Sequence, residues 1–252
     1  MSIKIDNVVL LSPEQWEAII RGMRNPLNSW DKIDSRECNI DTCIGCDNEC
    51  YERLPQGNEK DYVIGKNDAD LMKRLNKAGT EHRKFMRMIT VYMDITAPLY
   101  WWKEFDTYKV GTVCNSCSTM HKIAAKKFTL DDFSDEHLRC DGLFCDSMNA
   151  LKHTINVLNF WRDRYNESDE ERQNYFEQNG YSSVPSKKDC WWQMIQLLPS
   201  SYNQKRTIML NYEVLASMYH QRKNHKLDEW REFCEWIKTL PCSELIIGEE
   251  DE

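Results

Sequence analysis

The sequence predicts an α+β fold, because short segments with a strand-like alternation of apolar residues stand between longer segments with helical spacing. The clearest strand is 88–96, in which apolar residues occupy every second position. The clearest helix follows Ser147, the expected N-cap, with apolar residues every three or four positions. The 252 residues suffice for one elaborated domain or two small ones, and no Pro-, Gly- or Ser-rich linker divides them.

The N-terminal part is expected to form a strand and two helices. Residues 3–10 contain the apolar residues of a short strand. Ser12 is expected to cap the first helix, with Pro13 at its first position and Gln15 completing a capping box. Residues 68–78 have the spacing of a second helix, which Gly79 would end.

Residues 25–66 are expected to be polar and irregular, and they contain a group of four closely spaced cysteines: Cys38, Cys43, Cys46 and Cys50. Four thiolates within thirteen residues could hold a zinc ion or an iron–sulfur cluster. The alternatives are free thiols or a surface disulfide, and no metal ligand is assigned from this pattern.

The segment after the clearest strand is the one most typical of a functional site. Pro98 begins a helix whose aromatic residues belong either to the core or to a surface that stacks on a flat ring: Trp101, Trp102 and Phe105. A polar loop from Gly111 to His121 follows. Sites are often built on such loops, when a strand and a helix hold them in place.

Further helices and one further strand are expected in the C-terminal half. They are a charged turn or helix face at 165–173, a helix over 187–198, a strand ending at Asn211, a helix from there to Arg222, and a helix over 228–240.

Composition argues against two kinds of partner. The net charge of −8, from 33 basic and 41 acidic residues, does not favour binding to nucleic acid or to an anionic membrane. No apolar run is long enough to cross a bilayer, and the N-terminus lacks the pattern of a signal peptide, so a cytoplasmic protein is expected. In that compartment the eleven cysteines would be reduced, buried or bound to metal.

Two blocks of the sequence resemble the flavin-dependent thymidylate synthases, which methylate dUMP with reduced FAD and methylene-tetrahydrofolate. In the first block, His82 lies about one strand upstream of Ala97-Pro98. The family continues with R-H-R-x-x-S-x-N-E-x-S-x-R, and its Asn and second Ser match here in the run Asn115-Ser116-Cys117-Ser118-Thr119-Met120.

The second block begins at Leu198 and is similar to the family's L-P…N-x-x-x-L…R segment. The residues that match this segment at the family's spacing are Pro199, Asn211, Leu215 and Arg222. The two blocks stand in the family's order and together cover roughly half of the chain.

The motif departs from the family at its charged positions. Ser116 replaces a Glu, Lys109 stands near the R-H-R triplet, and Met120 and Ile195 replace two arginines that contact phosphate. Each lost contact is worth roughly 1.5–3 kcal/mol. Together the two losses would weaken dUMP binding by on the order of two to four decades.

The resemblance implies a single domain over 1–245, with a Cys-rich insertion at about 25–66 and an acidic tail at 246–252. It implies a mixed or antiparallel sheet flanked by helices, and a homotetramer. The cofactors would be FAD, NADPH and methylene-tetrahydrofolate, and the partner a small nucleotide rather than nucleic acid or a membrane.

The resemblance also implies roles for eight residues. Cofactor binding falls to His82, Lys109, Asn115 and Asn211, and substrate binding to Ser116, Ser118, Thr119 and Arg222. Arg222 has the catalytic role, because its planar guanidinium can match a uracil carbonyl and stabilise negative charge on the ring. From the residues alone, Arg222 could equally be a solvated charge on a helix.

Two alternatives to a dUMP methyltransferase remain open. One is a diverged flavin-dependent one-carbon transferase that acts on another pyrimidine nucleotide, which the replaced arginines favour. The other is a catalytically inactive scaffold of the same fold that binds a nucleotide or a protein.

Overall fold

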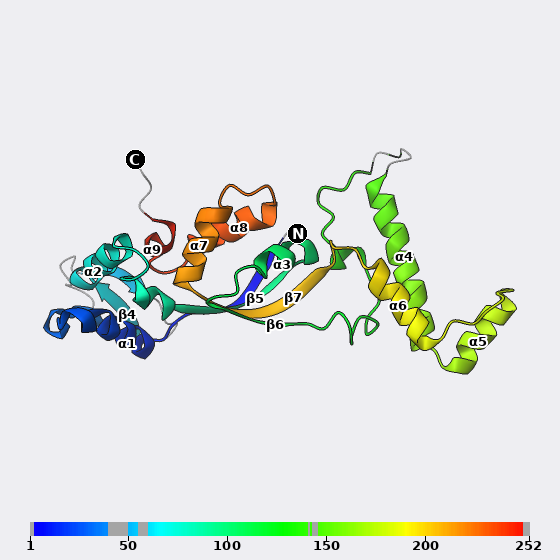
Figure 1. Cartoon of the computed structure of the whole chain (residues 1–252), viewed down its shortest axis with the longest axis horizontal. Coiled ribbons are helices and arrows are strands. Elements are labelled where there is room, and N and C mark those ends of the chain that lie inside the picture. The colour runs from blue at the N-terminus through cyan, green and yellow to red at the C-terminus, as the bar shows by residue number, and fades with distance from the viewer. Residues whose placement is uncertain (1–2, 40–49, 55–59, 141, 143–145, 249–252) are drawn as a thin grey trace. The chain divides into compact units, whose positions relative to one another are not determined.

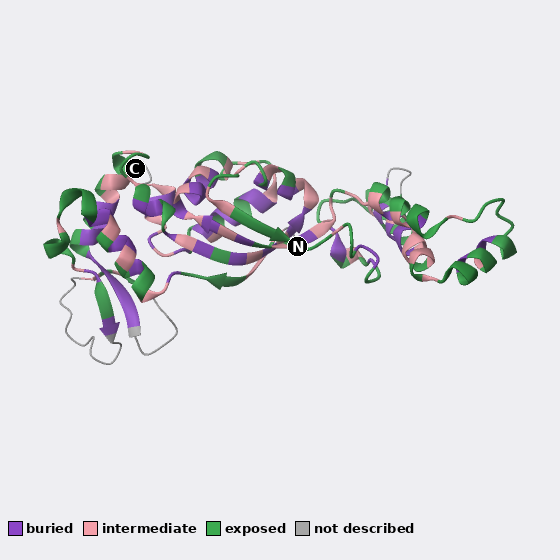
Figure 2. Ribbon diagram, turned by 60° about the horizontal axis from the view of Figure 1, so that its bottom comes forward, coloured by how far each residue is buried: buried purple, intermediate pink, exposed green. Residues whose placement is uncertain are grey.

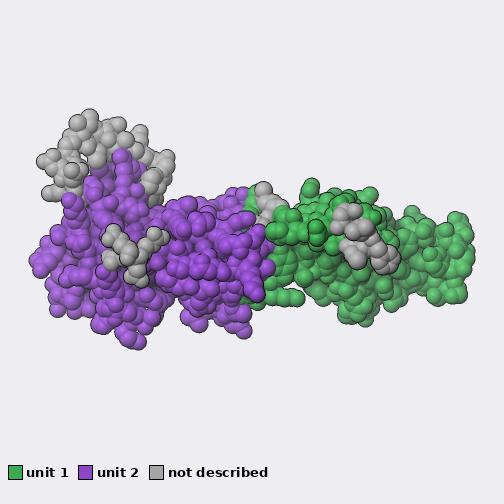
Figure 3. All heavy atoms as spheres, turned by 90° about the horizontal axis from the view of Figure 1, so that it is seen from above, with its two compact units in different colours: residues 1–4, 95–104, 116–206 green, residues 5–94, 105–115, 207–252 purple. Residues whose placement is uncertain are grey.

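A computed structural model describes residues 3–39, 50–54, 60–140, 142 and 146–248. Two compact units are coloured separately in Figure 3. Unit 1 comprises residues 1–4, 95–104 and 116–206, and unit 2 comprises residues 5–94, 105–115 and 207–252. The division into one domain with an insertion and a tail stays a prediction.

The larger sheet consists of four strands in the order β1-β5-β7-β6 (Figure 1). Their bounds are Lys4–Val9, Thr90–Pro98, Asn203–Asn211 and Thr112–Ser116, respectively. The sequence therefore located β1, β5 and β7 to within a few residues. The segment predicted as a polar loop from Gly111 contains β6, because its backbone pairs in the sheet although its side chains are polar and mostly exposed.

A second, antiparallel sheet occupies the segment that was expected to be irregular. It has the order β2-β4-β3, with strands Arg36–Asn39, Cys50–Leu54 and Lys60–Gly65 for β2, β3 and β4. Among the described residues of this sheet, Tyr62, Val63 and Ile64 form a buried apolar run on β4 (Figure 2). The outer strands are four and five residues long, which is too short for a periodic pattern to reveal them.

The cysteine cluster lies only partly on this sheet. Cys38 pairs with Asp61 across β2 and β4, and Cys50 pairs with Gly65 across β3 and β4. Cys43 and Cys46 lie outside the described residues, so the possible metal site there stays a hypothesis.

The first helix, α1 (Pro13–Arg24), forms as its sequence predicts. Ser12 is its N-cap, and a complete capping box joins it to Gln15. Its buried face consists of Trp16, Ile19, Ile20 and Met23. This face and helix α2 (Lys66–Lys77) both pack against β4.

A buried ion pair fixes α2 within unit 2. Arg24 Nε donates to Asp68 Oδ1 over 2.5 Å, and the two side chains are 4% and 0% exposed. The other carboxylate oxygen accepts from the backbone of Ser35 at 2.9 Å and from its hydroxyl at 2.7 Å. Burial opposes ionisation of Asp68, but the hydrogen bonds from Ser35 and Arg24 outweigh it and hold the pKa of Asp68 below its usual value.

Unit 1 is built on helices α4 (Ser147–Asn166), α5 (Asp169–Gln178) and α6 (Lys187–Leu197). Its core lies where α4 and α6 pack together, and it includes Phe128, Phe133, Leu158 and Met194. The predicted cap of α4 is wrong by one residue: Asp146, not Ser147, is the N-cap, because its carboxylate accepts from Asn149 N at 2.9 Å.

Helix α3 (Leu99–Phe105) places its tryptophans in the core rather than on a ligand surface. Trp101 is 0% exposed and Trp102 is 1% exposed. The indole N–H of Trp102 donates to the carbonyl of Gln204 at 2.9 Å. Of the two alternatives for these residues, the structure favours the core.

The chain continues from β7 into α7 (Tyr212–Arg222) and ends with α8 (Asp228–Ile237) and α9 (Glu244–Ile247). The sequence did not predict α9, which is a single turn. Among the described residues, no helix combines the length and the apolar character that crossing a membrane would require.

Replacement of Asp68 by Asn is expected to destabilise unit 2 by about 3–5 kcal/mol, because it leaves the buried guanidinium of Arg24 without its counter-charge. Asp70→Asn is the control, since Asp70 lies on the same helix but is exposed, and it should change the free energy of unfolding by no more than about 0.5 kcal/mol. Urea denaturation measures both variants.

The same ion pair predicts a pH dependence. Because the pKa of Asp68 is lowered in the folded state, its stabilisation is complete above about pH 4 and is lost as the pH falls through the lowered pKa. Asp68→Asn should remove that part of the acid sensitivity, and an unchanged profile would contradict the assignment.

Candidate functional site

The eight predicted site residues divide between the two units. His82, Lys109, Asn115, Asn211 and Arg222 belong to unit 2, and Ser116, Ser118 and Thr119 belong to unit 1.

Arg222 ends α7 and its side chain is held in place. Its Nε donates to Tyr108 Oη at 2.9 Å, and the same hydroxyl donates to Gln221 Oε1 at 2.9 Å. The guanidinium carbon lies 4.9 Å from the ring centroid of Trp230. Arg222 is therefore a partly buried, oriented cation, and not the freely solvated charge that the polar run around it also allowed.

The aromatic wall behind Arg222 is rigid. Trp230, on α8, is 0% exposed, and Phe105 stacks on it with ring centroids 6.5 Å apart. Tyr108 meets the same indole edge-on at 5.9 Å. Because these rings are packed, the guanidinium cannot swing away without losing both a hydrogen bond and a cation–π contact.

Asn211 caps the helix that carries Arg222. Its side-chain Oδ1 accepts from Val214 N at 3.0 Å, and its backbone N–H donates to Gly111 O at 3.2 Å. Gly111 has a φ of +81°, and a Cβ at this position would lie 2.6 Å from Asn211 Nδ2. The amide of Asn211 thus sits against a backbone that only glycine permits.

The remaining unit 2 residues are exposed. His82 lies in the turn after α2 and lines a pocket of about 290 Å³ whose walls are mostly apolar, formed by Met23, Leu27, Leu75, Phe85 and Met88. Lys109 follows Tyr108 directly, and Asn115 lies on β6. Lys109 and Asn115 are therefore accessible to a ligand.

In unit 1, the segment with the predicted phosphate ligands is attached to β7. Cys117 N donates to Lys205 O at 3.0 Å, and Gln204 Nε2 donates to Cys117 O at 2.8 Å. The exposed hydroxyl of Ser118 accepts from His121 N at 2.9 Å. This closes a turn that contains Thr119.

No protein-family model and no curated protein sequence matches this chain. Solved structures do match it. Thymidylate Synthase X (ThyX) from Helicobacter pylori, in a crystal structure with FAD and dUMP, has a TM-score of 0.55 and 13% identity, with 99% of this chain and 97% of the other covered. A second structure of ThyX from Helicobacter pylori, complexed with FAD and dUMP, has a TM-score of 0.53 and 14% identity, with 99% and 98% covered.

This chain has the ThyX fold. The match confirms the predicted α+β class with antiparallel sheets flanked by helices. At this level of identity it concerns the fold alone.

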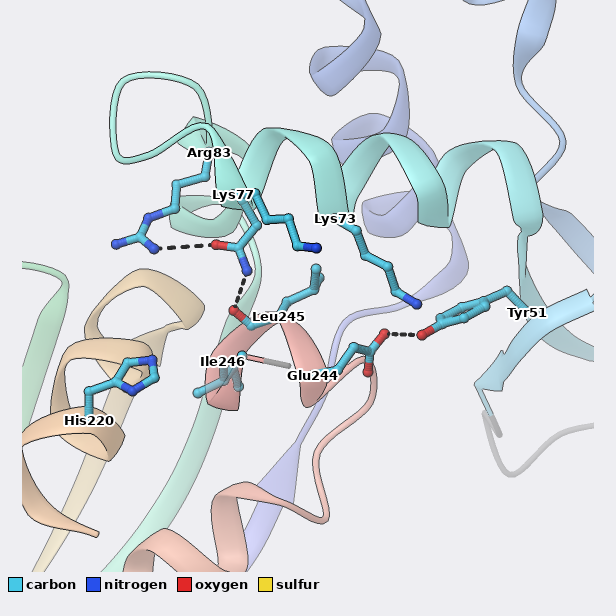
Figure 4. Close-up of a pocket in the computed structure, with 10 residues that line it drawn as sticks. Tyr51, Lys73, Lys77, Arg83, His220, Glu244, Leu245 and Ile246 are labelled. Carbon is cyan, nitrogen blue, oxygen red and sulfur yellow. Dashed lines mark hydrogen bonds between the residues drawn. The ribbon is translucent and has the colours of Figure 1, made fainter. Parts of the chain in front are cut away.

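Within this ThyX fold, sequence analysis missed a pocket of about 350 Å³ in unit 2, which we call the α2–α9 pocket (Figure 4). Its lining consists of Tyr51, Lys73, Asn76, Lys77, Arg83, His220, Glu244, Leu245, Ile246 and Gly248. The only local signal was the pair of lysines one helical turn apart on α2. The other walls come from β3, α7 and α9, and no sequence pattern connects those elements.

One group of described side chains next to this pocket has the composition of a metal site. Ligand atoms of Glu52, Cys242 and Glu244 all lie within 4.8 Å of one another. Glu52 already accepts from the backbone N–H of Cys242 at 2.7 and 2.8 Å. Burial, together with these carboxylates, raises the pKa of the Cys242 thiol, so a metal such as Zn²⁺ would first have to displace a proton.

Gly111→Ala is expected to destabilise the protein by more than Gly79→Ala. Both glycines have a positive φ, but a Cβ at Gly79 meets nothing within 4 Å, so Gly79→Ala reports the backbone cost alone, about 1–2 kcal/mol. The added methyl at Gly111 also displaces the amide that caps α7, at a further cost of about 1–3 kcal/mol. Thermal unfolding of the two variants measures the difference, and equal losses would show that Asn211 yields without strain.

Proposed function

We propose that the protein is a flavin-dependent thymidylate synthase that methylates dUMP at C5, with methylene-tetrahydrofolate as carbon donor and reduced FAD as hydride donor. The observation that carries the proposal is a fold match that spans 99% of this chain and reaches structures that contain both FAD and dUMP. The first sequence block runs from His82 through β5 and α3 to β6 and the turn after it, and the second runs from Leu198 through β7 to the end of α7.

The net reaction balances. The methylene carbon and one hydride become the C5 methyl group, the C5 proton is released, and tetrahydrofolate and oxidised FAD are the other products. When bound, reduced FAD supplies the hydride, and NADPH restores the reduced form. The protein's share is therefore to bind and orient its ligands rather than to supply a nucleophile.

Three predicted site residues in unit 2 offer hydrogen-bond donors that suit a flavin and a pyrimidine nucleotide. A flavin and a pyrimidine present carbonyl oxygens, ring nitrogens and phosphates, which are chiefly acceptors. The predicted residues Lys109, Asn211 and Arg222 offer an ammonium, an amide and a guanidinium. Asn211 Oδ1 accepts from Val214 N, and Arg222 Nε donates to Tyr108 Oη.

In this proposal Arg222 stabilises negative charge on the pyrimidine. Tyr108 and Trp230 orient its guanidinium before any ligand arrives, so little ordering is required at the moment of reaction. His82, beside its apolar pocket, faces the flavin, and Lys109 neutralises the FAD diphosphate. Asn115 as a cofactor ligand, and Ser116, Ser118 and Thr119 as substrate ligands, retain the roles predicted from the resemblance.

A second candidate is a one-carbon transferase for another pyrimidine nucleotide. Ile195, at the position of a phosphate-binding arginine, packs against the apolar core of unit 1. Met120 has an exposed side chain, and its carbonyl accepts from Trp191 Nε1 at 2.8 Å. Neither residue can replace a guanidinium, so the phosphate must be held differently or the nucleotide differs.

The protein should be yellow as isolated, or become so with FAD, and show the absorption bands of a bound flavin. With reduced cofactor and methylene-tetrahydrofolate, analysis of products from dUMP, dCMP and UMP then separates the two candidates. A colourless protein that stays colourless with FAD would refute both. Flavin binding without oxidation of NADPH would instead favour the inactive scaffold.

Asn211→Ser separates the two roles of Asn211. Serine also caps helices, so the free energy of unfolding should change by no more than about 0.5 kcal/mol. The amide donor is lost, however, and FAD affinity should fall by about tenfold. Flavin fluorescence titration and urea denaturation provide the two measurements.

Ser12→Ala is the matched control for the capping role. It removes a cap hydroxyl from α1, costs about 1 kcal/mol of stability, and should leave FAD affinity unchanged. If Asn211→Ser binds FAD as tightly as the parent protein does, Asn211 is a structural residue only.

A further inference from the structure

The α2–α9 pocket contains none of the eight predicted site residues, yet its walls concentrate positive charge. Lys73 and Lys77 lie one turn apart on α2, so they share a face of that helix. Arg83 follows from the turn after α2. In a chain with a net charge of −8, three cations around one pocket are a local feature and not a consequence of overall composition.

A hydrogen-bonded chain holds the third cation. Arg83 Nη2 donates to Glu213 at 3.0 Å and Nη1 donates to Asn76 at 3.3 Å. Asn76 in turn donates to the carbonyl of Leu245 at 2.9 Å, which joins α2 to α9 (Figure 4). Arg83 Nε is buried and has no hydrogen-bond partner in the described part of the chain.

The pKa of His220 is sensitive to the charges around the pocket, because His220 lines it. Its pKa is lowered, first by burial and then by the positive charges of Lys223 and Arg83. An anion bound beside it would oppose both charges and raise that pKa.

The opposite end of the pocket accepts hydrogen bonds. Tyr51 Oη donates to Glu244 Oε1 at 2.5 Å, and Lys73 Nζ lies 4.3 Å from the centroid of the Tyr51 ring. Figure 4 shows Lys73 directed from α2 toward this pair. A carboxylate repels an anion but accepts from hydroxyl groups, so the two ends suit different parts of one ligand.

We propose that the α2–α9 pocket binds a phosphorylated small molecule that also carries hydroxyl groups, of about the size of a nucleoside monophosphate. The lysines and Arg83 hold the phosphate, and Glu244 accepts from the sugar hydroxyls. The volume of about 350 Å³ lies within the range of small-molecule sites, which is about 300–1,000 Å³. This ligand is additional to the substrate of the proposed reaction.

The test follows the imidazole signals of the protein by NMR while AMP, ribose 5-phosphate, inorganic phosphate or adenosine is added. The six histidines of the chain all contribute imidazole signals. The signal of His220 is assigned as the one that is missing from the His220→Gln variant. AMP and ribose 5-phosphate are expected to shift the His220 signal and to raise its pKa, whereas adenosine should do neither.

Variants test the contacts. Lys73→Ala and Lys77→Ala should each weaken AMP binding by about tenfold or more. Lys66→Ala is the control, because Lys66 is exposed at the start of the same helix and outside the pocket. Glu244→Gln should weaken AMP and ribose 5-phosphate but not inorganic phosphate. Thermal unfolding confirms that each variant is folded.

The proposal is overturned if adenosine binds as tightly as AMP, if Lys66→Ala weakens binding as much as the pocket variants, or if AMP shifts other histidines and leaves His220 unchanged. Lys73 and Lys77 also line a neighbouring pocket with Arg24 and Asp31, and His220 distinguishes the two because it lines only the first. Failure to bind FAD would refute the proposed function without affecting this result.

Discussion

The buried carboxylate of Asp68 is the constraint on which the arrangement of unit 2 depends. It joins α2 to α1 through Arg24 and to the backbone of Asp34 and Ser35. Asp34 in turn accepts from the N–H groups of Asn67 and Asp68 at 2.8 and 3.0 Å, and so supplies the cap that Gly65 cannot. Breaking a buried ion pair of this kind is costly, which ties the start of α2 to one position.

Because the start of α2 is fixed, the side chains on its later turns have defined positions. Lys73 and Lys77 reach the α2–α9 pocket, and the turn that follows the helix presents His82 and Arg83. Helix α7 is used in a similar way, since Asn211 starts it, His220 lines the pocket and Arg222 ends it. Residues two positions apart on a helix do not face each other, so one helix can serve two sites.

The chain keeps the ThyX fold at 13–14% identity while several charged positions of the family motif have changed. This is physically consistent, because a fold depends on apolar pattern, caps and packing, whereas affinity for a phosphate depends on a few cations. Ile195 illustrates the difference. Its side chain is partly buried and packs against the apolar core of unit 1.

The sequence by itself determined the elements whose causes are local. The capping box at Ser12, the alternation in β5, the helix after Asn211 and the apolar face of α1 all follow from neighbouring residues, and the structure contains each of them. Asn211 and Arg222 became residues of interest through the resemblance to the flavin-dependent thymidylate synthases, not through their local sequence. The sequence did not reveal β2 and β3, which are too short to show a period and exist because β4 lies between them.

Only the tertiary structure decided how side chains distant in sequence meet. Tyr108 lies 114 residues from Arg222 in sequence, yet nothing in its local sequence indicates that its hydroxyl accepts a hydrogen bond from that guanidinium. The α2–α9 pocket likewise joins β3, α2, α7 and α9, and its mixture of three cations and one carboxylate exists only where those elements pack. Local propensity acts within a few residues, whereas burial and charge act between whichever surfaces the fold brings together.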